Sequence, residues 1–136
     1  MFSKICYADR ALESLKSDKA IRLGNTGGML GDSYEGMEIV NGVLIINYFG
    51  GSSTKWEEIY KFRYQDEDWY LIGYTNTDIS YGKEISTDSN FLTHRNQVKT
   101  INPSNREVVS DDWSDVPSGP LISLENFNIM EFLGFE

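Results

Sequence analysis

WEEIYKFRYQDEDWYLIG, residues 56–73, is the stretch of this chain that decides its fold. Aromatic residues fill four of the five even positions from Trp56 to Tyr64, while charged or polar residues fill most of the odd ones. Successive side chains of a strand point to opposite faces, so this alternation predicts a strand with one buried face. The acidic tip Asp66–Asp68 interrupts the pattern before Trp69 resumes it, which predicts a β-hairpin.

More strand and turn signals lie on both sides of this hairpin. The dipeptide Asn41-Gly42 tolerates the positive φ angles of a type I′ turn and predicts a second hairpin. Polar turn residues also separate short strand-like runs further along the chain. The strands predicted outside the 56–73 stretch span about 36–40, 43–49, 84–92 and 97–101.

Two helices are predicted near the chain ends. Apolar residues recur at helical spacing over about 7–17 and 124–133, and Ser123 and Gly134 are placed to cap and to stop the second helix. The predicted fold is therefore mainly β, or α+β by strict count. It is an antiparallel β-meander, a half-barrel or a sandwich, with a short helix near each terminus.

The length of 136 residues fits a single β-rich domain over residues 1–136. All three prolines of the chain fall between residues 102 and 120, among Ser, Asn, Asp and Gly. Such a composition disfavours regular structure. We therefore expect an irregular acidic connection over 102–120.

Negative charge is concentrated at one end of the chain. The last thirty residues, 107–136, hold seven acidic residues and no lysine or arginine, out of a net charge of −9. An acidic protein is repelled by nucleic acid and by anionic membranes, so we expect neither as a ligand. A basic protein is the expected partner.

The candidate partner-binding residues are acids grouped around an aromatic side chain. Trp113 lies within the expected connection beside Asp111, Asp112 and Asp115, and aromatic anchors ringed by charge suit a protein interface. Trp113 has a second interpretation, in which it only fixes its loop to the domain. The next candidates are the acids of the hairpin tip, Asp66, Glu67 and Asp68.

The sequence offers little for catalysis. Cys6 and His94 are the only Cys and His, too few for a zinc site, and no Gly-x-Ser-x-Gly motif is present. The glycine-rich run 24–31 lacks the Gly-Lys-Ser/Thr ending of a phosphate-binding loop. Glu57 and Glu58 are adjacent on a strand and so point to opposite faces. We expect no enzyme, no catalytic residue, no metal and no cofactor.

The aromatic stripe of the 56–73 stretch has two interpretations. Aromatic residues at strand spacing form the core of many small β domains, because each ring buries a large apolar area. The same rings could instead form a stacking platform for a sugar. Truncation of Phe62 would separate the two cases.

Two resemblances bear on function. The YKFRYQDEDWYLIG run, residues 60–73, resembles a strand motif of little-characterised bacterial proteins, and the similarity spans about residues 24–93. Many of those proteins are exported, which implies an exported β domain that binds carbohydrate or another ligand. By its small size, its acidity and its lack of catalytic residues, the chain also resembles the immunity proteins of contact-dependent growth inhibition and other polymorphic toxin systems.

The second resemblance implies an immunity (antitoxin) protein that neutralises a cognate bacterial toxin. Such toxins are often nucleases with a basic substrate-binding face, and we expect an RNase here. We expect the protein to be monomeric when free. We also expect it in the cytoplasm, because residues 1–6 are too short for the hydrophobic region of a signal peptide. The alternative is a periplasmic protein whose signal peptide has been removed.

Overall fold

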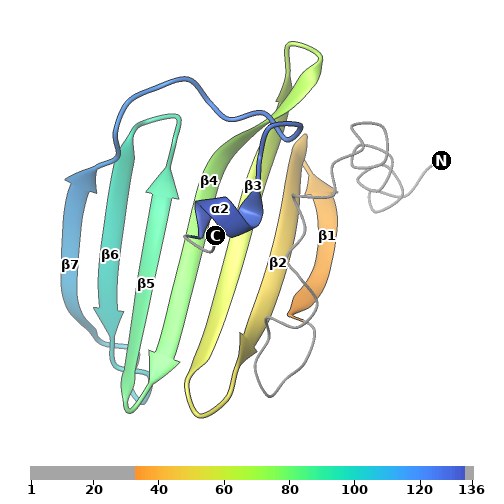
Figure 1. Cartoon of the computed structure of the whole chain (residues 1–136). Helices are drawn as coiled ribbons and strands as arrows, with labels where there is room; N and C mark the ends of the chain where they lie inside the picture. The colour runs from red at the N-terminus through yellow and green to blue at the C-terminus, as the bar shows by residue number, and fades with distance from the viewer. Residues whose placement is uncertain (1–32, 134–136) are drawn as a thin grey trace.

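The structure, a computed structural model, describes residues 33–133. They form one open antiparallel sheet of seven strands in the order β1-β2-β3-β4-β5-β6-β7 (Figure 1). The strands are β1 (Tyr34–Val40), β2 (Val43–Gly51), β3 (Lys55–Gln65), β4 (Asp68–Ser80), β5 (Lys83–Asn90), β6 (Arg95–Ile101) and β7 (Val108–Asp115). Each strand pairs with the next one in sequence, so the predicted mainly β meander is confirmed.

Tight turns explain why the chain folds as a meander. Asn41 and Gly42 have φ angles of 52° and 78°, as the predicted type I′ turn requires. Asp66 and Glu67, with φ of 51° and 63°, turn the chain between β3 and β4 in the same way. A type I′ turn matches the twist of the two strands it joins, so each strand returns beside the previous one.

One expectation about the connection 102–120 is wrong. Residues 108–115 form β7, the edge strand of the sheet, paired with β6 from Arg95↔Asp115 to Ile101↔Val108. The stretch carries no apolar alternation because seven of its eight residues are exposed, so neither face gives a period-2 signal. The sheet therefore has seven strands, one more than the two hairpin strands and four further strands that the sequence predicted.

The C-terminal segment covers one face of the sheet. After β7 the chain crosses over the upper end of the sheet, and helix α2 (Ile129–Phe132) lies across β3 and β4 (Figure 1). The N–H of Leu71 donates to the carbonyl of Ile122 at 2.8 Å, and the N–H of Leu124 donates to the carbonyl of Trp69 at 2.7 Å. These bonds fasten the segment to the edge of β4 that β5 leaves unpaired.

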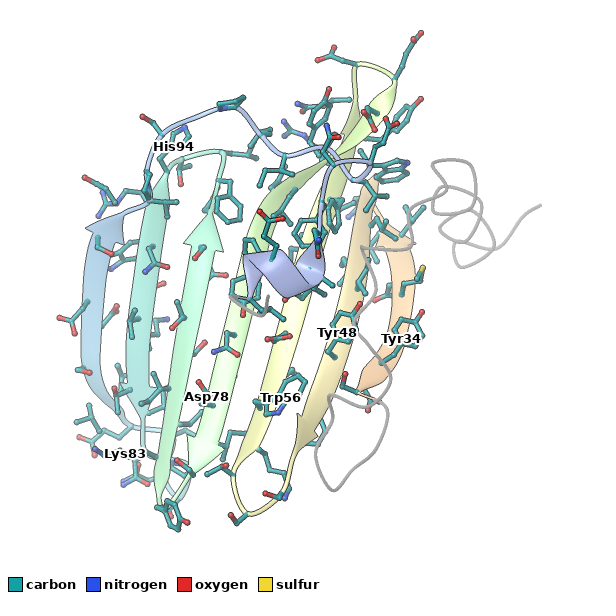
Figure 2. The ribbon with its side chains drawn as sticks, in the orientation of Figure 1. Tyr34, Tyr48, Trp56, Asp78, Lys83 and His94 are labelled. Carbon is teal, nitrogen blue, oxygen red and sulfur yellow. The ribbon has the colours of Figure 1, made fainter. Side chains whose placement is uncertain are left out.

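The core lies between this segment and strands β1–β4. Leu124, Phe127 and Ile129 are each at most 2% exposed, and each such side chain contributes about 1.5–3 kcal/mol of burial. Tyr48 and Tyr60 meet edge to face with ring centroids 5.8 Å apart. Tyr34 and Tyr48, on the neighbouring strands β1 and β2, continue the row at 6.0 Å (Figure 2).

The aromatic stripe of β3 belongs mainly to this core. Tyr60 and Phe62 are 1% and 0% exposed, so neither ring can present a face to a sugar. Tyr64 is 49% exposed, because it lies near the end of the hairpin, and its ring packs against Trp69 at 5.2 Å. The core interpretation therefore holds for Tyr60 and Phe62 and fails for Tyr64.

The predicted C-terminal helix is shorter than expected. Only Ile129–Phe132 is helical, and Asn128, not Ser123, caps it by accepting from the N–H of Glu131. Ser123 instead closes a turn, in which the N–H of Asn126 donates to its carbonyl at 3.1 Å. The predicted helix over 7–17 and the glycine-rich run 24–31 lie outside the described residues.

Gly51, at the end of β2, is the glycine whose replacement we expect to be costly. Its φ is +119°, and an added Cβ would lie 2.1 Å from the carbonyl oxygen of Thr54. We expect Gly51→Ala to lower the free energy of unfolding by about 2 kcal/mol, measured by urea denaturation. Gly82→Ala is the control, because Gly82 has a φ of +78° with nothing within 4 Å, and should cost about 1 kcal/mol. Equal losses would show that the contact with Thr54 is irrelevant.

The other half of the sheet, β5–β7, is a single layer. No helix or further strand among residues 33–133 packs on either of its faces (Figure 1), and most of its side chains are polar on both, with Ile85, Val109 and Trp113 among the exceptions. Cross-strand hydrogen bonds hold it together, including Thr75 to Asp88 at 2.6 Å and Ser89 to Asn96 at 2.9 Å. The acidic edge strand therefore projects well away from the core.

Candidate partner-binding surface

The first candidate surface is the β7 edge, which we define as residues Val108–Asp115. It is the outermost strand of the described sheet, and it carries three aspartates and no basic residue. Its larger apolar side chains are also exposed, with Val109 68% and Trp113 57% accessible. Exposed apolar side chains among acids give the composition expected of an interface with a basic protein.

The pairing register assigns each side chain of the β7 edge to one face. Trp113 is opposite Gln97 and Asp112 is opposite Val98, and side chains directly opposite share a face. The residues paired in turn with Asp112 across the sheet end at Glu58 on β3 and Tyr48 on β2. Asp112 therefore lies on the same face of the sheet as these two residues, which is the face that α2 covers at β3 and β4. Asp111, Trp113 and Asp115 share the other face.

Contacts from β6 organise the Trp113 face. Gln97 donates from Nε2 to Oδ1 of Asp111 at 2.9 Å. The guanidinium of Arg95 lies 5.3 Å from the centre of the Trp113 ring, and its Nε is 3.6 Å from Oδ1 of Asp115. Trp113 thus stacks with a cation on the neighbouring strand and does not fix a loop to the domain. A ring held in place loses less conformational entropy when a partner binds.

The loop from β6 to β7 fixes where the β7 edge begins. The guanidinium of Arg106 donates to both carboxylate oxygens of Glu84, at 2.5 and 3.4 Å, and this pairing raises the pKa of Arg106. Within the loop the N–H of Asn102 donates to the carbonyl of Glu107 at 2.9 Å. These bonds give the loop a defined turn, although residues 102–107 form no helix or strand, as the sequence predicted.

The second acidic group occupies the tip of the β3–β4 hairpin. Asp66 and Glu67 are its two central residues, and Oδ1 of Asp68 accepts from the N–H of Trp69 at 2.7 Å. Figure 1 shows this tip at the same end of the sheet as the end of β7. Three strand spacings, about 14 Å in all, separate β4 from β7, so the two acidic groups are distinct surfaces.

A small apolar pocket lies under the crossover segment that follows β7. It encloses about 200 Å³ and is lined mainly by aliphatic and aromatic side chains, Phe91 and Phe132 among them. His94, in the turn between β5 and β6 (Figure 2), is the one titratable residue of its lining. His94 also lines a neighbouring, more open hollow together with Thr93, Asp115 and Ser118.

Glu58 is the buried carboxylate of the described core. Strand alternation leaves Glu57 exposed and puts Glu58 at 6% exposure, so the prediction that the two face opposite ways is confirmed. The hydroxyls of Tyr60 and Tyr74 donate to its two oxygens at 3.4 Å each. Glu58 thus acts as a hydrogen-bond acceptor within the core.

Within residues 33–133 no three His, Cys, Asp or Glu side chains converge on a point that could hold a metal ion. Over that range no helix is long and apolar enough to cross a membrane.

The structure divides the predicted partner-binding residues between two surfaces. Asp111, Asp112, Trp113 and Asp115 lie on the β7 edge, and Asp66, Glu67 and Asp68 lie on the hairpin tip. The sequence did not indicate that Arg95 and Gln97 belong with the first group, because their proximity follows from the register between β6 and β7. No protein-family model, curated protein or solved structure matches this chain.

Proposed function

We propose that this protein is an immunity protein that binds and neutralises a bacterial toxin, a nuclease that cleaves RNA. The observation that supports the proposal is the β7 edge, where three aspartates and the exposed Trp113 lie on a strand at the boundary of the sheet. The rest of the C-terminal region adds four more acids and no base. An immunity protein needs a surface of this kind and no catalytic group.

The charge argument follows from what a nuclease must do. An RNase binds a polyanion, so its substrate-binding face is basic, and an acidic protein that covers this face competes directly with RNA. The exposed indole of Trp113 supplies an apolar anchor of the type that dominates binding energy in protein interfaces. Charge speeds association and the anchor slows release.

The proposal also specifies where the protein acts and in which state. A toxin that cleaves RNA acts inside the cell, so its inhibitor is needed in the cytoplasm. All the charged side chains of the β7 edge are aspartates. Two copies paired along this edge would bring like charges together, which destabilises the pairing. We therefore propose a monomer that forms a complex with one toxin domain.

The direct test is neutralisation of a toxin encoded beside the gene of this protein. The toxin domain is expressed from an inducible promoter with or without the immunity protein, and growth is measured. The purified domain is then assayed for RNA cleavage as the immunity protein is added. We expect restored growth and full inhibition at a 1:1 ratio. Undiminished cleavage in the presence of excess protein would refute the function.

Salt dependence is the prediction specific to the acidic surface. If the acidic end steers the toxin, the association rate should fall ten-fold or more between 20 mM and 150 mM NaCl, because ions screen charges beyond about 10 Å at 0.1 M. Stopped-flow fluorescence measures this rate through the exposed indole of Trp113. An association rate that does not change with salt would show that charge does not steer the toxin to this surface.

A further inference from the structure

The β7 edge offers backbone groups as well as side chains. The N–H of Val116 donates to the carbonyl of His94 at 2.9 Å, just past the last residue pair of β6 and β7. In an antiparallel ladder, residues that bond to the neighbouring strand alternate with residues whose N–H and C=O point away from it. Counted back from Val116 in steps of two residues, the next residues that bond to β6 are Ser114 and Asp112.

The outward backbone groups therefore belong to Asp111, Trp113 and Asp115. The other end of the pairing gives the same result. There the N–H of Asn102 donates to the carbonyl of Glu107 at 2.9 Å, and the alternation counted from this bond agrees once the register shift between Thr100 and Ile101 is included. No described strand pairs with this side of β7. Three N–H and three C=O groups thus form an open row, the template that an extended segment needs to add to a sheet.

The aspartates determine which segment this template accepts. Natural sheets block exposed edges with proline, lysine or short strands, yet residues 108–115 contain no proline or lysine and extend over eight residues. Two copies paired antiparallel about Trp113 would bring Asp111 of each copy opposite Asp115 of the other, and like charges directly opposite destabilise a sheet. Charge repulsion therefore disfavours pairing between two copies of the β7 edge, and the same charges favour a cationic strand.

We propose that the β7 edge binds an extended lysine- or arginine-rich segment of the partner as an eighth strand of the sheet. The segment bonds to the backbone of Asp111, Trp113 and Asp115, and its cations lie opposite the aspartates. Trp113, stacked with Arg95, offers its exposed ring to an apolar side chain of the same segment. The identity of the partner rests on the proposed function, whereas the template can be tested without it.

The test uses the full-length protein and an eight-residue peptide with lysine, valine and lysine at alternate positions and threonine at the others, so that one face can place the two lysines opposite Asp111 and Asp115 and the valine opposite Trp113. Amide hydrogen exchange is followed by NMR at saturating peptide. We expect exchange at Asp111, Trp113 and Asp115 to slow ten-fold or more. Exchange at Asp112 and Ser114, which already bond to β6, should change less than two-fold. Binding without protection at the three outward amides would overturn the proposal, and so would an absence of binding at millimolar peptide.

A matched pair of variants separates backbone pairing from charge. Asp111→Pro removes an outward N–H that the fold does not use, and Asp111→Ala removes the same charge but keeps that N–H. We expect the proline variant to bind the peptide at least ten-fold more weakly than the alanine variant, by calorimetry. Equal affinities would overturn the proposal. The peptide can also be N-methylated on those alternate residues whose N–H groups point toward β7. It should likewise lose binding, although its charge is unchanged.

The two proposals fail in different ways. Toxin neutralisation that is equal for Asp111→Pro and Asp111→Ala leaves the immunity function standing and overturns strand addition. Protection of the three amides by the peptide, without neutralisation of any toxin, supports strand addition and counts against the immunity function. Sedimentation of the free protein as a dimer whose outward amides are already protected would assign the edge to a second copy and overturn the proposal.

Discussion

Phe62→Ala will lower the free energy of unfolding by about 3–5 kcal/mol, the largest loss of stability that we expect from one substitution. The side chain is 0% exposed on the interior strand β3, and its ring meets that of Phe127 with centroids 5.4 Å apart. Truncation leaves a cavity between the sheet and the C-terminal segment that covers it. Urea denaturation followed by tryptophan fluorescence measures the loss.

Tyr64→Ala is the matched control, two residues along the same face of the same strand. Tyr64 is 49% exposed and its main contact is the ring of Trp69, so the loss should stay below about 1.5 kcal/mol. If Phe62→Ala kept the stability of the parent and Tyr64→Ala did not, the core would lie elsewhere than at the centre of β3.

The part of the fold that the sequence predicts most clearly is the part with one buried face. The 56–73 stretch alternates because the C-terminal segment covers one side of β3 and β4 and solvent contacts the other. Asn41-Gly42 predicts its turn because few dipeptides tolerate two positive φ angles. In both cases a local physical constraint leaves a local sequence signal.

The single-layer half of the sheet leaves a weaker signal, from which strands were predicted over 84–92 and 97–101, close to β5 and β6, but β7 was missed. Residues 75–80 of β4 and all of β7 have polar or exposed side chains on both faces, so hydrophobic periodicity is lost although the backbone ladder continues. The strand β7 is specified by pairing with β6, which is a non-local interaction. The stacking of Arg95 on Trp113 depends on the same register, and for this reason sequence reasoning missed Arg95.

The missed strand changes the argument for binding. An irregular loop would have to become ordered when a partner binds, at a cost in conformational entropy for each residue. A strand already paired along one side presents its acids, its indole and its backbone groups in a fixed geometry. The same residues that suggested a partner from composition alone therefore form a more effective surface as an edge strand than as a loop.

The second large effect is expected from neutralising the β7 edge. Asp111→Asn, Asp112→Asn and Asp115→Asn combined with Trp113→Ala should weaken toxin binding by about 2–4 kcal/mol, or about 30-fold or more, because the variant removes both the charge and the apolar anchor. Asparagine is preferable to lysine here. Lys99 is opposite Asp111 and Arg95 is opposite Asp115, so charge reversal would create like-charge pairs within the sheet.

The fold should survive this variant, which makes the affinity interpretable. The four side chains are exposed, and loss of the Arg95–Trp113 stacking costs about 0.5–1 kcal/mol, so the total loss of stability should stay below about 2 kcal/mol. The control neutralises the hairpin tip through Asp66→Asn, Glu67→Gln and Asp68→Asn, which removes the same number of negative charges. If affinity depends only on long-range charge, both variants lose it equally. If the β7 edge is the interface, the tip variant mainly slows association and the edge variant speeds release, and surface plasmon resonance measures the two rates separately.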